Sequence, residues 1–176
     1  MDHMCQIYGS NATFMDALEG YVGSGLRAGE SVVVIARARH LHELEQRLRA
    51  AWIDLDRARW EDRFIALLAE ETLDKFMVKG WPDEARFRET VTGLIARARG
   101  KDNRPVRAFG EMVSVLWNQG RAGATVHLEN LWSQIQEEFR FPIFCAYPRD
   151  GFEPKTTEAS VRTICELHSR VIPSRV

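Results

Sequence analysis

The run Val32-Val33-Val34-Ile35 limits the possible folds of this chain more than any other stretch. Four β-branched residues in a row, with no polar residue among them, are typical of a strand covered on both faces, as in a parallel sheet. Two further apolar runs, Phe64–Leu68 and Ile143–Tyr147, have the same character, and segments of helical periodicity separate the three. We therefore expect an α/β fold with a mostly parallel central sheet and helices on both faces.

Length and composition limit the number of domains and the kinds of partner that this chain can have. The 176 residues, 45% of them hydrophobic, suit a single domain spanning 1–176. The formal net charge of −1 creates no field that would favour nucleic acid or an anionic membrane surface. The sequence shows no signal-peptide pattern and no apolar run near the ~20 residues of a membrane span. We expect a cytoplasmic protein with neither nucleic acid nor membrane as a partner.

Some segments give less regular signals. Leucines at helical spacing predict a helix from His40 to Trp52, and the charged stretch after it has room for a short edge strand at 53–55. Trp52, Trp117 and Trp132 lie on or near apolar stripes, so we expect all three in the core.

The strand that ends in Gly110-Glu111, where a helix begins, is the second informative feature. Ligands of open α/β sheets bind at the carboxyl ends of the strands. If the strands are parallel, the ends that carry Tyr8, Arg37, Glu111 and Tyr147 gather at one edge. One anion, one cation and two phenols are the kind of convergent polar groups found in small-molecule pockets. The alternative is that Arg37 and Glu111 form only a surface ion pair, worth about 0 to 1 kcal/mol.

The turn after the first strand lacks the residues of a phosphate-binding loop. Residues 8–13 read Tyr-Gly-Ser-Asn-Ala-Thr, with one glycine and no lysine, so the main contacts to β- and γ-phosphates are missing. The chain also has no Gly-x-Ser-x-Gly elbow that would present a nucleophilic serine. We therefore predict a protein that is not an enzyme and carries no cofactor.

A metal site is a weaker hypothesis at this stage. His3 and Cys5 stand two apart on the expected first strand and so face one side, and Cys145 is a further candidate. Zinc needs more ligands, and the chain contains no paired Cys-x-x-Cys or His-x-x-x-His. We interpret the cysteines as buried structural thiols, and His127 as a solvent-facing or capped residue near the pocket edge.

Several stretches together resemble the MEDS domain, the sensory domain of methanogen and methylotroph regulators and the dichloromethane regulator. They are His3–Tyr8, Gly25–Val33, Val106–Met112, Leu128–Trp132, Phe144–Pro148 and the tail Ile164–Pro173. The Gly-Glu-Met triplet at 110–112 and the Cys-Ala-Tyr-Pro stretch at 145–148, at this distance from each other, make the resemblance specific. It runs nearly from end to end.

The resemblance implies a fold related to RecA and the clock ATPase KaiC, with the phosphate-binding loop lost. It also implies a signal-transduction domain that senses small hydrocarbon derivatives and relays to a histidine kinase, a transcription regulator or a second copy of itself. Glu111, Glu129 and Tyr147 are motif positions, and with Tyr8 and Arg37 they form our candidate ligand-binding set. Two alternatives stay open: a degenerate nucleotide-binding protein of RecA/KaiC type, and an interaction module whose pocket its own side chains fill.

Overall fold

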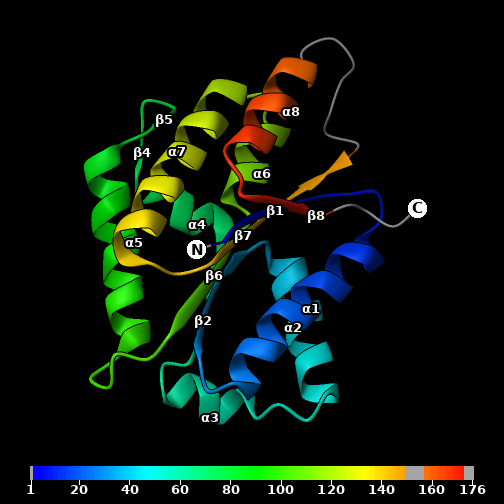
Figure 1. The fold of residues 1–176 in the computed structure, drawn as a ribbon, viewed down its shortest axis with the longest axis vertical. Coiled ribbons are helices and arrows are strands. Elements are labelled where there is room, and N and C mark those ends of the chain that lie inside the picture. Colours follow the sequence, from blue (N-terminus) through cyan, green and yellow to red (C-terminus); the bar gives the residue numbers. More distant parts are fainter. Residues whose placement is uncertain (1, 150–156, 173–176) are drawn as a thin grey trace.

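Six parallel strands form the central sheet, in the order β3-β2-β6-β7-β1-β8 (Figure 1). The computed structural model describes residues 2–149 and 157–172, with the backbone alone over 157–161, so Pro173 lies outside it. The strands are β1 (His3–Tyr8), β2 (Ser31–Ala36), β3 (Phe64–Leu68), β6 (Val106–Gly110), β7 (Ile143–Pro148) and β8 (Arg170–Ile172). All neighbouring pairs in this sheet are parallel, which confirms the predicted α/β class.

Helices cover both faces of the sheet. On one face lie α1 (Asn11–Arg27), α2 (Ala38–Ala50) and α3 (Leu55–Trp60). On the other lie α4 (Ala69–Asp74), α5 (Glu84–Arg99), α6 (Met112–Asn118), α7 (Ala122–Phe139) and α8 (Thr157–Glu166). A small antiparallel pair, β4 (Met77–Val78) and β5 (Trp81–Pro82), precedes α5. This pair was not predicted: the periodicity of Leu73, Phe76 and Met77 indicated a short helix up to Gly80, but α4 ends at Asp74.

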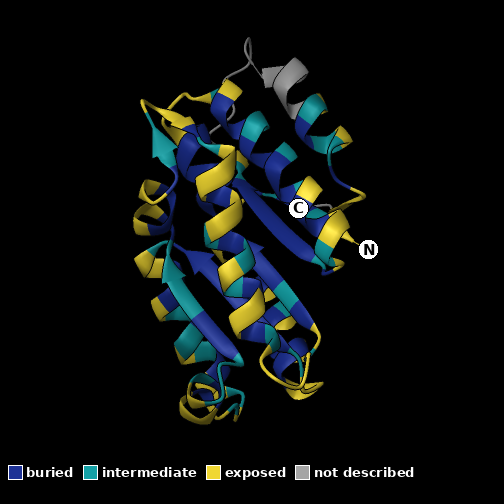
Figure 2. Cartoon of the chain, turned by 90° about the vertical axis from the view of Figure 1, so that its left-hand side faces the viewer, coloured by how far each residue is buried: buried dark blue, intermediate teal, exposed yellow. Residues whose placement is uncertain are grey.

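The two-residue alternation of the strands divides the core into two hydrophobic layers. All six residues of β2 are buried, as the β-branched run predicts. Val33 and Ile35 pack in the layer under α5 and α6, whereas Val32 and Val34 pack in the layer under α1 and α2. Figure 2 shows most residues of the inner strands in the buried colour, between helices whose outer faces are exposed. The sheet therefore separates two hydrophobic core layers, one on each of its faces.

Two local expectations were wrong. The segment after α2 forms α3 rather than an edge strand, because the Asp54 side chain caps it by accepting the Arg57 N–H at 3.0 Å and Leu55 and Ala58 pack inward. Trp52 is 96% exposed, since α2 ends at Ala50 and a left-handed backbone at Trp52 (φ 60°) turns the ring away. Trp117 and Trp132 are buried as predicted.

The chain leaves the neighbouring strands β2 and β6 on opposite faces of the sheet. Helix α2 follows β2 onto one face, and α6 follows β6 onto the other. In open α/β sheets the carboxyl ends at such a point, where the chain departs in opposite directions, are the usual place for ligands. Arg37 and Glu111 are the first residues after these two strands.

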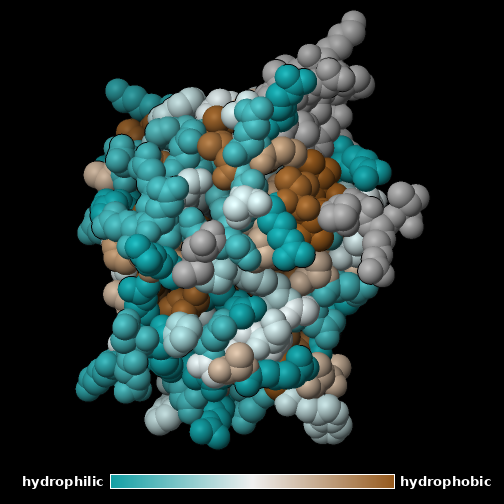
Figure 3. Space-filling view, in the orientation of Figure 1, coloured by the Kyte–Doolittle hydropathy of each residue, from teal (hydrophilic) through white to brown (hydrophobic). Residues whose placement is uncertain are grey.

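On the face seen in Figure 3, hydrophilic residues cover most of the area and smaller hydrophobic areas lie between them. Among the described residues, no helix has both the length and the apolar character needed to cross a membrane.

Candidate functional site

Glu111 is a buried carboxylate that connects the ends of β2 and β6. It stands at the N-cap of α6 and is 1% exposed. Its Oε2 accepts the backbone N–H of Arg37 at 2.8 Å, and His40 Nδ1 lies 2.9 Å from both carboxylate oxygens. The Arg37 guanidinium is 3.7 Å from Oε1. One carboxylate thus ties the first turn of α2 to the start of α6.

The geometry leaves one nitrogen of His40 without a partner. Because a carboxylate oxygen accepts, His40 Nδ1 is the donor to Glu111 and the second ring nitrogen, Nε2, is left over. Nε2 is buried and has no hydrogen-bond partner among the described residues. A buried polar atom in this state calls for a hydrogen-bond partner, which a ligand can supply.

Tyr8 and Phe14 form an aromatic cluster beside His40 and Glu111. Its ring stacks on Phe14 at 4.6 Å, and Phe14 stands edge-on to His40 at 4.9 Å. Burial raises the pKa of the Tyr8 phenol, Glu111 raises it further, and Arg37 opposes them. The Tyr8 phenol is therefore near enough to Glu111 and Arg37 for both charges to influence its pKa.

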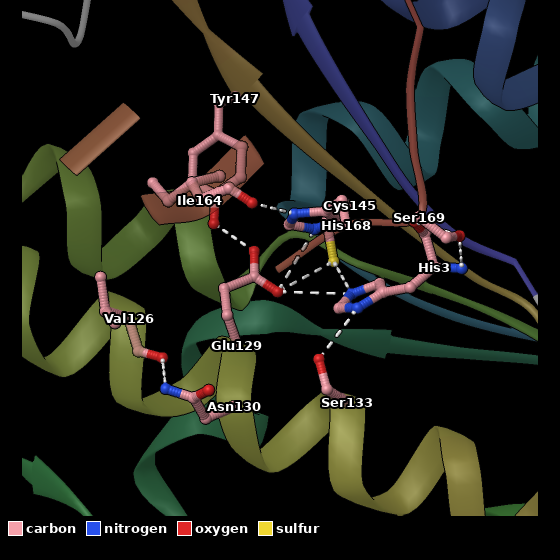
Figure 4. Close-up of polar contacts among 10 residues, drawn as sticks. All are labelled: His3, Val126, Glu129, Asn130, Ser133, Cys145, Tyr147, Ile164, His168 and Ser169. Carbon is pink, nitrogen blue, oxygen red and sulfur yellow. Dashed lines mark hydrogen bonds and ion pairs between the residues drawn. The ribbon is translucent and has the colours of Figure 1, made fainter. Parts of the chain in front are cut away.

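A second polar cluster lies on the other face of the sheet, around Glu129 of α7. Tyr147 at the end of β7 donates its hydroxyl to Glu129 Oε1. Glu129 Oε2 lies 3.4 Å from His3 Nε2, 3.5 Å from His168 Nε2 and 3.7 Å from Cys145 Sγ (Figure 4). All five side chains are buried.

A comparison of the sequence with protein families identifies the family of this chain. A family model described as "MEthanogen/methylotroph, DcmR Sensory domain" matches residues 2–163 of the chain. This chain belongs to the MEDS family. No curated protein matches it. Most of this MEDS domain lies within the match, but His168 follows it.

The structure divides the five predicted ligand residues of this MEDS domain into two groups. Tyr8, Arg37 and Glu111 meet on the α1–α2 face, as predicted. Tyr147 and Glu129 meet on the opposite face, because Tyr147 has the same parity as Cys145 in β7 and points under α7. The expected single neighbourhood for both tyrosines was therefore wrong. Ligand binding by any of the five stays a prediction.

Burial controls the ionisation of the Glu129 cluster. It raises the pKa of the Cys145 thiol and of the Tyr147 phenol well above their ordinary values, and Glu129 adds to both effects. Burial also acts to raise the pKa of Glu129, but the two imidazoles and the Tyr147 hydroxyl together lower it. Burial lowers the pKa of His168 against the opposing effect of Glu129. A carboxylate thus stands beside a neutral thiol and a neutral phenol.

Sequence reasoning missed His40 and His168. His40 had a usable signal, since it stands in the first helical turn after Arg37 and so near the strand end. His168 had none, because its partner His3 is at the other end of the chain. Cys5 is buried on the same face as Cys145 but does not join the four-residue cluster. His127 does not reach the Glu111 site; its ring stacks on Trp81 at 5.4 Å.

Proposed function

We propose that this MEDS domain is a non-enzymatic sensor that binds a small organic ligand at the carboxyl ends of β1, β2 and β6. The observation that carries the proposal is the buried Glu111 carboxylate, which fixes Arg37 and His40 where the chain departs to opposite faces. Membership of a sensory family supports the same role.

The residues at the site have distinct tasks in this proposal. The Arg37 side chain is 21% exposed, so its guanidinium is the group that meets an anionic or carbonyl oxygen of the ligand. The rings of Tyr8 and Phe14 contact the hydrocarbon part of the ligand. His40 Nε2 supplies a further polar contact. A small hydrocarbon derivative with one oxygen-bearing group matches these contacts.

The signal leaves the site through α2 and α6. Glu111 bonds to the first residues of α2 and is itself the cap of α6, so a ligand that draws Arg37 away changes the position of one helix relative to the other. The ligand biases this equilibrium only by its difference in affinity for the two arrangements. A regulator, a kinase or a second copy of the chain then reads the position of the helices.

A melting-temperature screen tests this function. The chain is heated with a panel of small carboxylic acids, ketones, alcohols and halogenated hydrocarbons, and separately with nucleotides and magnesium. A compound present at 100 times its Kd stabilises the fold by about 2.7 kcal/mol, which the screen detects. We expect stabilisation by an oxygen-bearing hydrocarbon derivative. Stabilisation by nucleotide and magnesium alone would instead favour the degenerate nucleotide-binding class.

Paired variants then locate the site. Arg37→Ala removes the accessible cation, and we expect it to abolish the stabilisation by the compound found in the screen. Arg49→Ala is the matched control, because Arg49 lies at the other end of α2 and pairs only with exposed Asp56 at 2.7 Å among the described residues. Equal stabilisation of the two variants would contradict the proposed site.

A further inference from the structure

Four side chains with metal-binding atoms converge inside the Glu129 cluster. They are His3 of β1, Glu129 of α7, Cys145 of β7 and His168, which follows α8. One ligand atom from each lies within 4.8 Å of the other three, and all four residues are buried. Buried polar groups need hydrogen-bond partners, and buried charges are paired or coordinate a metal ion.

Four of the six distances between these atoms are close to those of a tetrahedral metal site, and the other two are no longer than 4.8 Å. Zinc bonds of about 2.0–2.1 Å to nitrogen and oxygen and about 2.3 Å to sulfur place neighbouring ligand atoms roughly 3.3–3.6 Å apart. Glu129 Oε2 is 3.4 Å from His3 Nε2 and 3.5 Å from His168 Nε2. Cys145 Sγ is 3.7 Å from both His3 Nε2 and Glu129 Oε2. Four edges of the tetrahedron are therefore within a few tenths of an ångström of the required lengths.

Both histidines are held in the orientation that metal ligation requires. His168 Nδ1 contacts the backbone carbonyl of Ile164, which only accepts, so Nδ1 carries the proton and Nε2 offers a lone pair. His3 Nδ1 lies 3.1 Å from Ser133 Oγ, which leaves its Nε2 toward the cluster as well. A second-nitrogen hydrogen bond of this kind is the usual support of a metal-bound histidine.

Two hydrogen-bond acceptors of the cluster, His168 Nε2 and Glu129 Oε2, face each other with no cation between them in the described part of the chain. His168 Nε2 has no hydrogen-bond partner among the described residues, and 3.5 Å away it faces a carboxylate oxygen that also accepts. Two lone pairs that face each other in a buried site repel unless a proton or a cation lies between them. A cation bound by both removes the repulsion and satisfies the orphaned nitrogen.

We propose that His3, Glu129, Cys145 and His168 bind one zinc-type divalent transition-metal ion. The thiolate and imidazoles select such an ion over magnesium or calcium, and Cys145 releases its proton on binding. All four positions are protein ligands, which is the pattern of a structural site. The ion fastens the segment after α8, including β8, to β1, β7 and α7.

A surface pocket borders the proposed metal site on the side of His3. A surface pocket of about 590 Å³ lies between α7 and the segment after α8, and its lining includes His3, Ser133 and Ser169. Ser133 and Ser169 both hydrogen-bond to His3, so the pocket ends at a residue of the metal site.

Cobalt binding by the full chain tests the proposal. After treatment with a chelator, the wild-type protein is titrated with Co²⁺, whose absorption bands report thiolate ligation and tetrahedral geometry. We expect one Co²⁺ per chain, displacement by Zn²⁺, and a higher melting temperature with either ion. Absence of the thiolate band and of any change in melting temperature would overturn the proposal.

Cysteine variants identify the ligand. Cys145→Ser should abolish the thiolate band, whereas Cys5→Ser should keep it, because Cys5 is the register neighbour of Cys145 but stands outside the cluster. A band that follows Cys5 or Cys165 would overturn the assignment. Arg37→Ala should bind Co²⁺ like the wild type, which separates this test from that of the ligand site.

A milder substitution keeps the test decisive if Cys145→Ser does not fold. Ser133→Ala removes only the hydrogen bond to His3 Nδ1, and we expect the affinity for Co²⁺ to fall about 10–100-fold. Gln134→Ala, on the exposed side of the same helix, is the control and should change nothing. Equal affinities of these two variants would contradict the assigned role of His3.

Discussion

Glu111 is the residue on which the geometry of the ligand site depends. The buried carboxylate accepts a backbone N–H and an imidazole N–H and lies 3.7 Å from the partly exposed guanidinium of Arg37. Removing one member of a buried charged group leaves the others without compensation, at a cost of roughly 3–5 kcal/mol. We therefore expect Glu111→Ala to lower the free energy of unfolding by about that amount in denaturant titrations.

The control for this prediction is the other carboxylate near Arg37. Glu70 Oε1 lies 3.7 Å from Arg37 Nε, but the Glu70 side chain is 55% exposed. Glu70→Ala should change the free energy of unfolding by no more than about 0.5 kcal/mol. If both substitutions cost the same, burial would not be what gives Glu111 its importance.

At the residue scale, the sequence predicted that Arg37 and Glu111 lie together, but it did not predict the surroundings of Tyr147. A glutamate after a strand-ending glycine identified Glu111, and parallel strands placed Arg37 beside it. Tyr147 was assigned to the wrong face, because the alternation of β7 becomes known only once one of its residues is placed. His168 could not be predicted to reach His3, since a contact between residues 165 positions apart leaves no local pattern.

At the element scale, α1 offers a matched pair of glycines. A Cβ added at Gly20 would have nothing within 4 Å, but one added at Gly25 would lie 2.7 Å from Arg107 Nε and 2.8 Å from its Cδ. Gly20→Ala should stabilise the protein by about 0.4–1 kcal/mol through the restricted unfolded chain. Gly25→Ala should destabilise it by roughly 1–3 kcal/mol, as overpacking does.

Thermal and denaturant unfolding of the two variants measure this difference. The loss at Gly25 follows from its neighbour, because Arg107 of β6 donates to the Tyr21 carbonyl at 2.9 Å and to Ser24 Oγ at 3.0 Å and has little freedom to move. Stabilisation by both substitutions would mean that α1 and β6 pack less closely than the structure indicates.

Regular elements of this fold were predictable, and irregular ones were not. The β-branched run of β2 and the apolar run of β7 gave strands with both faces buried. The β4–β5 pair, with two residues in each strand, is too short to leave a periodic signal. The α3 helix was missed because only Leu55 and Ala58 form its buried apolar side, which is too short a pattern to show a helical period. The Asp54 side chain stabilises the start of this helix by accepting the Arg57 N–H.

At the scale of the whole molecule, burial of the tyrosines predicts a pH limit. All three have a pKa raised above the ordinary value of about 10, chiefly by burial. A phenol whose pKa is higher in the folded state stabilises the fold below its unfolded pKa and loses that contribution as pH rises through the folded value. The free energy of unfolding should therefore fall above about pH 10.

An absorbance titration of tyrosinate checks this expectation. In denaturant the phenols should ionise near pH 10, and in the folded chain they should ionise only at higher pH or together with unfolding. Tyr8→Phe should make the alkaline loss of stability shallower. Phenolate that appears near pH 10 while the fold persists would show that the tyrosines are open to water.

The two faces of the sheet carry separate chemistry in this account: a ligand site at Arg37 and Glu111, and a metal site around Glu129 that fastens the chain's last segments. Whether the fold is also RecA- or KaiC-like, and whether the chain forms a single domain, stay predictions of the sequence.

Hydrogen exchange of backbone amides, with and without the compound that stabilises the protein most, tests the central claim most directly. The account predicts slower exchange at residues 36–41 and 110–113, where the Arg37 N–H and the start of α6 meet Glu111. Protection confined to the pocket between α7 and the segment after α8, at residues 133–140 and 166–169, would contradict it.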